Sequence, residues 1–112
     1  MSGITSHVLD LSTGKPAAGV DIALEHIDDK HGWHAVARAQ TDADGRVKDA
    51  FAKLHGPGRY RLRFATGAYF AARGVTCFHP EVTVVFEVRD DTEHHHVPLL
   101  LSPYGYSTYR GS

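Results

Sequence analysis

The stretch VDIALEHI, residues 20–27, alternates apolar and polar side chains. Val20, Ile22 and Leu24 fall on one face of an extended chain, whereas Asp21 falls on the other. Successive side chains of a β-strand point to opposite faces, so this alternation is typical of a strand that is buried on one side. A period of two, rather than about 3.6, dominates the sequence and indicates a fold built mainly from strands.

The same pattern recurs on both sides of this stretch. In residues 58–64, arginines alternate with Tyr60, Leu62 and Phe64, which predicts a strand with its apolar face inward. The other strands expected are 4–11, 33–40, a short 46–47, 81–88, 95–101 and 104–109. Residues 68–74 are expected to form the one short helix, because alanine favours helices and Gly74 can end one.

Turn-forming residues separate these elements at 12–16, 28–32 and 41–45. Pro98, inside an expected strand, indicates an edge strand or a local break in pairing, because proline has no N–H to donate. About seven or eight short strands and one helix at these spacings predict an all-β, antiparallel β-sandwich. The 112 residues have the size of one domain, which we expect to span residues 1–112.

The composition limits the classes of function. The formal net charge is -1, which argues against nucleic acid or an anionic membrane as the main partner, because both attract a concentrated basic face. No apolar run approaches the ~20 residues of a membrane span, and residues 1–7 lack the basic and apolar parts of a signal peptide. The single cysteine, Cys77, cannot form an internal disulfide, so we expect a cytoplasmic location.

Nine histidines are many for this length, and their positions must decide which of them matter. On a strand, His94 and His96 would share one face and His95 would take the other. Two imidazoles on one face can bind zinc or transfer protons, yet the polar start of a strand is enough to explain His94 and His95. His96 directly precedes an apolar run that must be anchored, which favours a fixed position. His7 and Arg46 each lie at an expected strand, but the sequence alone does not bring them together.

Three other motifs favour simpler interpretations. DADG at 42–45 begins like a calcium loop, but Lys53 stands where such a loop needs a glutamate, so a turn is favoured. Ser107 lacks the Gly-x-Ser-x-Gly context of a hydrolase nucleophile. On a strand, Cys77 and His79 would share a face and could pair, although a buried, unreactive cysteine is much more common.

Six blocks carry a recognisable pattern: SHVLD at 6–10, GKPAAGV at 14–20, TDADGR at 41–46, FHPEV at 78–82, HVPLLLSP at 96–103 and YGYSTYRGS at 104–112. Together they resemble the 5-hydroxyisourate hydrolases of the transthyretin-like family, over essentially the whole chain. The terminal YRGS at 109–112 separates these hydrolases from transthyretin, a hormone carrier of the same fold. His79 and His95 stand where aromatic residues are common in the family, and the extra imidazoles favour incidental metal binding.

The resemblance implies a transthyretin-like (prealbumin-like) sandwich, assembled as a homotetramer with sites at the dimer–dimer interface and without a cofactor. It implies 5-hydroxyisourate as the small-molecule substrate, hydrolysed to 2-oxo-4-hydroxy-4-carboxy-5-ureidoimidazoline in urate degradation. The site residues that it implies are His7, Arg46, His96, Tyr109 and Ser112.

These residues suit the hydrolysis of a cyclic amide, which needs a base for water, a donor for the oxyanion and an acid for the leaving nitrogen. We expect His7 and His96 to position and deprotonate the water, and one of them to reprotonate the nitrogen, because histidine titrates near pH ~6.5. We expect Arg46 to bind the carbonyl oxygen and stabilise the tetrahedral intermediate. Tyr109 and Ser112 would hydrogen-bond the substrate or orient a histidine.

Two other classes of function remain open. A small-ligand carrier of the transthyretin type would have the same fold and no chemistry. A zinc-dependent hydrolase could use His7 and His96, but zinc sites usually have three or more protein ligands, and no Cys or His-x-x-x-His spacing supplies the others. We therefore expect no metal in the site.

Overall fold

The alternating stretch around residues 20–27 forms a strand in this computed structural model, which describes residues 3–112. Met1 and Ser2, which belong to the expected domain 1–112, lie outside the described residues. The strands are β1 (Gly3–Asp10), β2 (Lys15–Pro16), β3 (Asp21–Asp28), β4 (Gly32–Gln40), β5 (Arg46–Phe51), β6 (Gly58–Phe64), β7 (Val82–Val88), β8 (His94–Ser102) and β9 (Gly105–Thr108). The described part of the chain holds one α-helix, α1 (Thr66–Ala71), and no helix long and apolar enough to cross a membrane.

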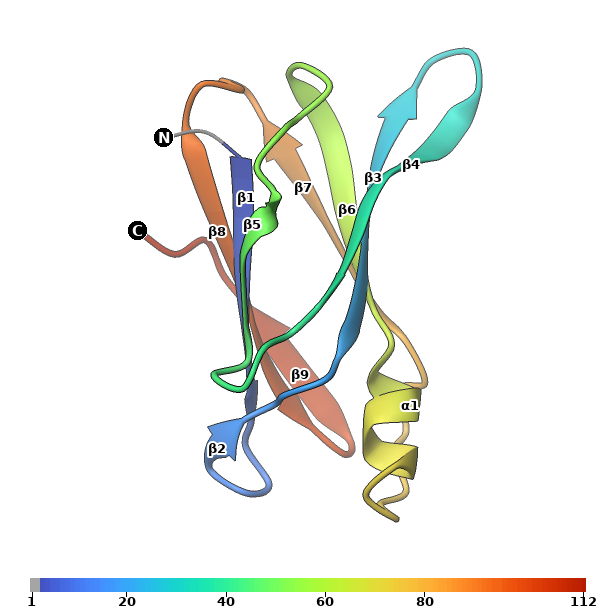
Figure 1. Cartoon of the computed structure of the whole chain (residues 1–112). Helices are drawn as coiled ribbons and strands as arrows, with labels where there is room; N and C mark the ends of the chain where they lie inside the picture. The colour runs from blue at the N-terminus through green and yellow to red at the C-terminus, as the bar shows by residue number, and fades with distance from the viewer. Residues whose placement is uncertain (1–2) are drawn as a thin grey trace.

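These strands form two sheets that face each other, with α1 at one end (Figure 1). One sheet has the order β2-β1-β8-β9, with β5 also paired to β1, and the other has the order β4-β3-β6-β7. The expected all-β sandwich is confirmed. It has nine strands across residues 3–112 rather than seven or eight, because the punctuating stretch at 12–16 contains the two-residue β2. The sandwich also departs from a purely antiparallel one, since β1 and β8 pair in parallel.

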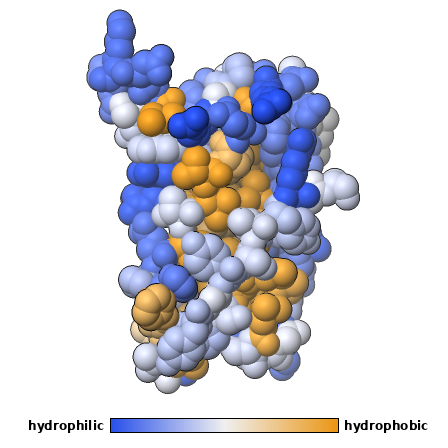
Figure 2. Space-filling view, turned by 180° about the vertical axis from the view of Figure 1, so that it is seen from behind, coloured by the Kyte–Doolittle hydropathy of each residue, from blue (hydrophilic) through white to orange (hydrophobic). Residues whose placement is uncertain are grey.

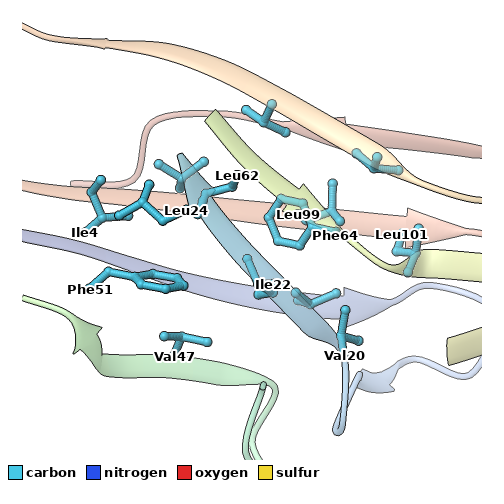
Figure 3. Packing of buried hydrophobic residues seen from close by; sticks show 14 of the residues in the cluster. Ile4, Val20, Ile22, Leu24, Val47, Phe51, Leu62, Phe64, Leu99 and Leu101 are labelled. Carbon is cyan, nitrogen blue, oxygen red and sulfur yellow. The ribbon is translucent and has the colours of Figure 1, made fainter. Parts of the chain in front are cut away.

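The core lies between the sheets and is built from the alternating side chains that the sequence pattern places inward. Tyr60, Leu62 and Phe64 are all fully buried, as predicted for residues 58–64. Figure 3 shows the inner residues of both sheets packed together, among them Ile4, Ile22, Leu24, Leu99 and Leu101. Burial of each such side chain stabilises the fold by roughly 1.5–3 kcal/mol. The apolar face of each strand therefore turns inward, and its polar face stays on the outside of the sandwich.

Pro98 lies in β8, between β1 and β9 rather than at the edge of the sheet. The pairing of β8 with β9 ends at Leu99 opposite Thr108, and it resumes only at an isolated bridge between His96 and Gly111. Pro98 therefore falls in a gap of the ladder where no N–H is required. The predicted local break in pairing is confirmed, and the break leads the last residues of the chain back towards His96.

The helix begins at Thr66 and ends at Ala71, so it starts and ends earlier in the chain than the expected residues 68–74. Gly74 lies just beyond its end, as predicted for a stop. The Tyr69 hydroxyl donates a hydrogen bond to Oδ2 of the buried Asp10 at 2.7 Å and thereby ties the helix to β1. Burial alone would raise the pKa of Asp10, but hydrogen bonds from Ser12, Tyr69 and Thr13 hold it below its ordinary value. Burial and this carboxylate raise the pKa of Tyr69 to about 12.

Replacing Tyr69 with phenylalanine would remove this hydrogen bond and keep the ring. We expect Tyr69→Phe to lower the free energy of unfolding by roughly 1.5–3 kcal/mol, the range for hydrogen bonds to charged groups. Chemical denaturation at neutral pH measures the change, with Tyr104→Phe as the control because Tyr104 is exposed. Equal stability of the two variants would show that the Asp10–Tyr69 contact does not hold the helix in place.

Candidate active site

The strand register brings His7, Arg46 and His96 to one face of the five-stranded sheet. His7 is opposite Arg46 of β5 on one edge of β1, and Thr5 is opposite His96 of β8 on the other edge. Residues directly opposite each other in neighbouring strands share a face, and so do residues two apart in one strand. The intervening Ser6 is buried, so this shared face is the outer one, turned away from the core.

The turn before β5 positions Arg46. Oδ1 of Asp42 accepts hydrogen bonds from the backbone N–H groups of Asp44 and Arg46, both at 2.9 Å. The bond from Arg46 is the main reason why the pKa of Asp42 lies below its ordinary value. Gly45 has a φ of +75° and lies so close to β1 that a Cβ atom would be 2.5 Å from the Val8 carbonyl oxygen. The predicted turn is confirmed, and its tight contact with β1 places Arg46 beside His7.

His7 has a defined tautomer. Its Nε2 lies 3.0 Å from the backbone carbonyl oxygen of Asp44. A carbonyl oxygen can only accept a hydrogen bond, so Nε2 of the neutral ring carries the proton and Nδ1 carries the lone pair. The ring of His7 therefore offers Nδ1 as its proton acceptor.

His96 is held by Thr5 and shares this partner with His94. The Thr5 hydroxyl lies 2.8 Å from Nδ1 of His96 and 2.7 Å from Nε2 of His94. A hydroxyl has one proton, so Thr5 donates to one imidazole and accepts from the other. When Thr5 donates to His94, Nδ1–H of His96 donates to Thr5, and Nε2 of His96 carries the lone pair.

The electrostatic surroundings favour the neutral form of His96. Burial lowers the pKa of His96, and the charge of Arg46 lowers it further, followed by smaller effects from His94 and His7. The ring centroids of His94 and His96 are 6.4 Å apart. A histidine with a lowered pKa stays unprotonated to more acidic pH and can act as a base at neutral pH.

The C-terminal segment runs alongside His96. The backbone N–H of Gly111 donates to the carbonyl oxygen of His96 at 2.8 Å. The ring of His96 packs so closely on Gly111 that a Cβ atom at position 111 would overlap it. Ser112, the next residue, is exposed. The YRGS terminus thus packs against the imidazole that the sequence singled out.

The structure places Tyr109 differently from the other predicted site residues. Its side chain is exposed and lines a cleft of about 200 Å³ between β7 and β8. The same cleft is lined by His95 and Val97, which point to the opposite side of β8 from His96. His95 lies at the start of β8, as expected, but it is buried, and its Nδ1 is 3.1 Å from the Glu93 carbonyl oxygen.

The sequence did not single out Thr5, and it explained His94 as the polar start of a strand; the structure places both beside His96. Both lie two residues before a predicted site residue on the same strand, so the period of two could have placed them on the same face. Cys77 and His79 are outside any strand, and the Cys77 thiol donates to the His79 backbone carbonyl at 3.6 Å instead of meeting its ring. The strand geometry assumed for that pair was therefore wrong.

The contact between Gly111 and His96 leads to a prediction. We expect Gly111→Ala to displace the His96 ring. With His96 as the expected base, the turnover of 5-hydroxyisourate should then fall by about tenfold or more, because misplacing a catalytic group by ~1 Å can cost a factor of about 10². Gly105→Ala is the control, since a Cβ atom there meets nothing within 4 Å. Steady-state turnover and thermal unfolding of both variants would separate a site effect from a folding effect. Parental turnover in Gly111→Ala would contradict this positioning role.

Comparison with known proteins identifies the family. Residues 4–111 match the HIUase/Transthyretin family. A 5-hydroxyisourate hydrolase of Salmonella dublin is 49% identical over 110 residues, which cover 97% of this chain and 80% of that protein. The structure of Klebsiella pneumoniae 5-hydroxyisourate hydrolase has a TM-score of 0.85 at 37% identity and covers 99% of this chain and 100% of its own. The structure of sea bream transthyretin in complex with thyroxine has a TM-score of 0.88 at 31% identity, and the match covers 96% of this chain and 93% of that chain.

The fold alone does not distinguish the hydrolase from transthyretin, because the two TM-scores are nearly equal. Sequence identity is higher to the two hydrolases, 49% and 37% against 31%. The resemblance found in the six sequence blocks is confirmed over almost the whole chain. The chain belongs to the HIUase/Transthyretin family, and its relatives from Salmonella dublin and Klebsiella pneumoniae are 5-hydroxyisourate hydrolases.

Proposed function

We propose that this protein hydrolyses 5-hydroxyisourate to 2-oxo-4-hydroxy-4-carboxy-5-ureidoimidazoline, a step of urate degradation. The observation that carries the proposal is the placement of two histidines and an arginine, His7, His96 and Arg46, on one outer sheet face. The names of the hydrolase relatives supply the substrate. A carrier of the transthyretin type has no need for a histidine whose pKa is lowered by burial and by a neighbouring arginine.

In this mechanism His96 is the base. Its Nε2 takes a proton from water, which attacks the ring carbonyl carbon while Nδ1 of His7 accepts a hydrogen bond from the same water. The protonated His96 then gives the proton to the leaving ring nitrogen, and the C–N bond breaks. Arg46 binds the carbonyl oxygen and stabilises the negative charge that develops on it, because its guanidinium stays charged and offers a planar fork of donors.

Ser112 and Tyr109 have supporting roles in the proposal. Ser112 follows the residue that packs on His96, so its hydroxyl can reach a molecule bound beside that ring. Tyr109 lines the cleft on the opposite side of β8, and in this proposal its side chain holds the terminus in place from there. No cofactor takes part in these steps.

The assembly in this proposal is a homotetramer of single-domain subunits, with the sites at the dimer–dimer interface. The site lies on an outer face of a sheet, and a second copy of the chain across that face would exclude water from the reaction. Apolar residues also gather on one side of the molecule (Figure 2), and Val85 and Tyr106 are among the exposed large apolar side chains. The free Cys77 suits a reducing compartment, so we place the protein in the cytoplasm.

The decisive experiment follows the ultraviolet absorbance of freshly formed 5-hydroxyisourate with and without the protein. Decay faster than the spontaneous rate supports the hydrolase, and unchanged decay supports the carrier. A chelator arm tests the zinc-dependent alternative, which requires activity to disappear. Removal of Ser112 alone tests whether the terminal residue takes part in turnover, and the mass in solution tests the tetramer.

A further inference from the structure

Three histidines outside the candidate active site converge at the end of the sandwich opposite α1. They are His26 of β3, His34 of β4 and His55 of the loop between β5 and β6, and their nearest nitrogen atoms all lie within 4.8 Å of one another. His26 and His34 are directly opposite each other in the β3–β4 register. The ring centroids are 5.5 Å apart for His26–His34, 6.3 Å for His26–His55 and 5.9 Å for His34–His55. Figure 1 shows the β3–β4 hairpin and the β5–β6 loop at this same end.

The buried Tyr60 fixes two of these histidines. The His26 ring stacks on the Tyr60 ring with centroids 4.3 Å apart. The Tyr60 hydroxyl accepts a hydrogen bond from the backbone N–H of His55 at 2.8 Å and donates one to the Gly56 carbonyl oxygen at 2.6 Å. One core side chain thus holds both the His26 ring and the loop that carries His55, so the cluster is part of the folded structure rather than a chance meeting of mobile side chains.

A carboxylate completes the surroundings of the cluster. Oδ2 of Asp28 lies 3.4 Å from Nδ1 of His34. Carboxylates commonly orient metal-bound histidines through such contacts, or supply a further oxygen ligand. The other oxygen of Asp28 accepts hydrogen bonds from the backbone N–H groups of Lys30 and His31, which fixes the carboxylate in the hairpin turn.

We propose that His26, His34 and His55 form a binding site for a divalent transition metal, with Zn²⁺ as the best match. Zinc takes imidazole nitrogens at about 2.0–2.1 Å in tetrahedral geometry, which puts nitrogen atoms roughly 3.3 Å apart. The nitrogen atoms now lie within 4.8 Å of one another, so metal binding would require the half-buried His34 and the exposed His55 to rotate towards the ion. Three imidazoles leave a fourth position for Asp28 or water. The metal would join the β5–β6 loop to the β3–β4 hairpin.

This site is separate from the candidate active site. His26 and His34 belong to the four-stranded sheet, whereas His7 and His96 belong to the five-stranded one. The two sites therefore give different results in a metal titration, because each can be removed by its own substitutions. The proposal also stands whether or not the protein hydrolyses 5-hydroxyisourate.

The test is a titration of the metal-free full-length protein with Co²⁺, followed by its visible d–d absorption and by displacement with Zn²⁺. We expect one strong tetrahedral site per chain, and we expect His34→Gln and His55→Gln each to weaken binding by about tenfold or more, because each removes one of three ligands. His31→Gln is the matched control, since His31 lies in the same hairpin and also contacts Asp28 but is outside the cluster. His94→Gln controls for binding at the active-site histidines.

The same variants have a second readout in thermal unfolding. A metal that binds the folded chain raises its midpoint temperature, so Zn²⁺ should raise the midpoint of the parent and of His31→Gln by several degrees but leave His55→Gln nearly unchanged. The proposal is overturned if His34→Gln and His55→Gln bind Co²⁺ like the parent. It is equally overturned if His94→Gln is the variant that loses the absorption.

Discussion

Replacing His96 with asparagine is expected to lower the turnover of 5-hydroxyisourate by about 10²–10⁴-fold, the usual contribution of general acid–base catalysis. Asparagine keeps a polar group near the Thr5 hydroxyl, which contacts His96 Nδ1 at 2.8 Å, but it lacks the Nε2 base. Steady-state kinetics measures the loss, and circular dichroism checks that the sandwich is intact. His31→Asn is the control, because His31 is an exposed histidine of the β3–β4 turn.

The pH dependence of kcat/KM gives a second test of His96. The neutral imidazole is the active form of a base, and its pKa is lowered by burial and by Arg46. Activity should therefore persist below the ordinary histidine value of ~6.5 and fall only as the pH drops through the lower pKa of His96. This acid limb should be absent from the residual activity of His96→Asn. Near-parental turnover in that variant would show that another group takes the proton from water.

The outer and inner faces of single strands could be predicted from the sequence, because alternation is a local property. Residues 58–64 have Tyr60, Leu62 and Phe64 inside as predicted. Which strands become neighbours is not local. The parallel pairing of β1 with β8 joins segments from opposite ends of the chain. The alternation within a strand shows which of its faces is buried, but it does not show which strand is its neighbour.

The same limit applies to the candidate site. Resemblance to a family suggested His7, Arg46 and His96, but only the register of β1 with β5 and β8 explains why they share a face. The triad His26, His34 and His55 has no regular ligand spacing in the sequence. It depends on one strand pairing and on a loop held by the Tyr60 hydroxyl, and neither can be read from local patterns.

Replacing Arg46 with methionine is expected to have two effects of different origin. Turnover should fall by about 10²–10³-fold, as when one oxyanion donor is removed from an active site. The acid limb of kcat/KM should also move to higher pH, because the Arg46 charge is, after burial, the main influence that lowers the pKa of His96. Without that charge His96 binds its proton more tightly, so the base is lost earlier as the pH falls.

Arg46→Lys separates these two effects, because lysine keeps the positive charge and loses the planar fork of donors. We expect turnover to fall in this variant too, while the acid limb stays close to that of the parent. pH profiles of kcat and kcat/KM for the parent and both variants provide the comparison. A limb that stays in place in Arg46→Met would disprove the electrostatic link between Arg46 and His96. Parental turnover in both variants would show that the charge on the carbonyl oxygen is stabilised by another group.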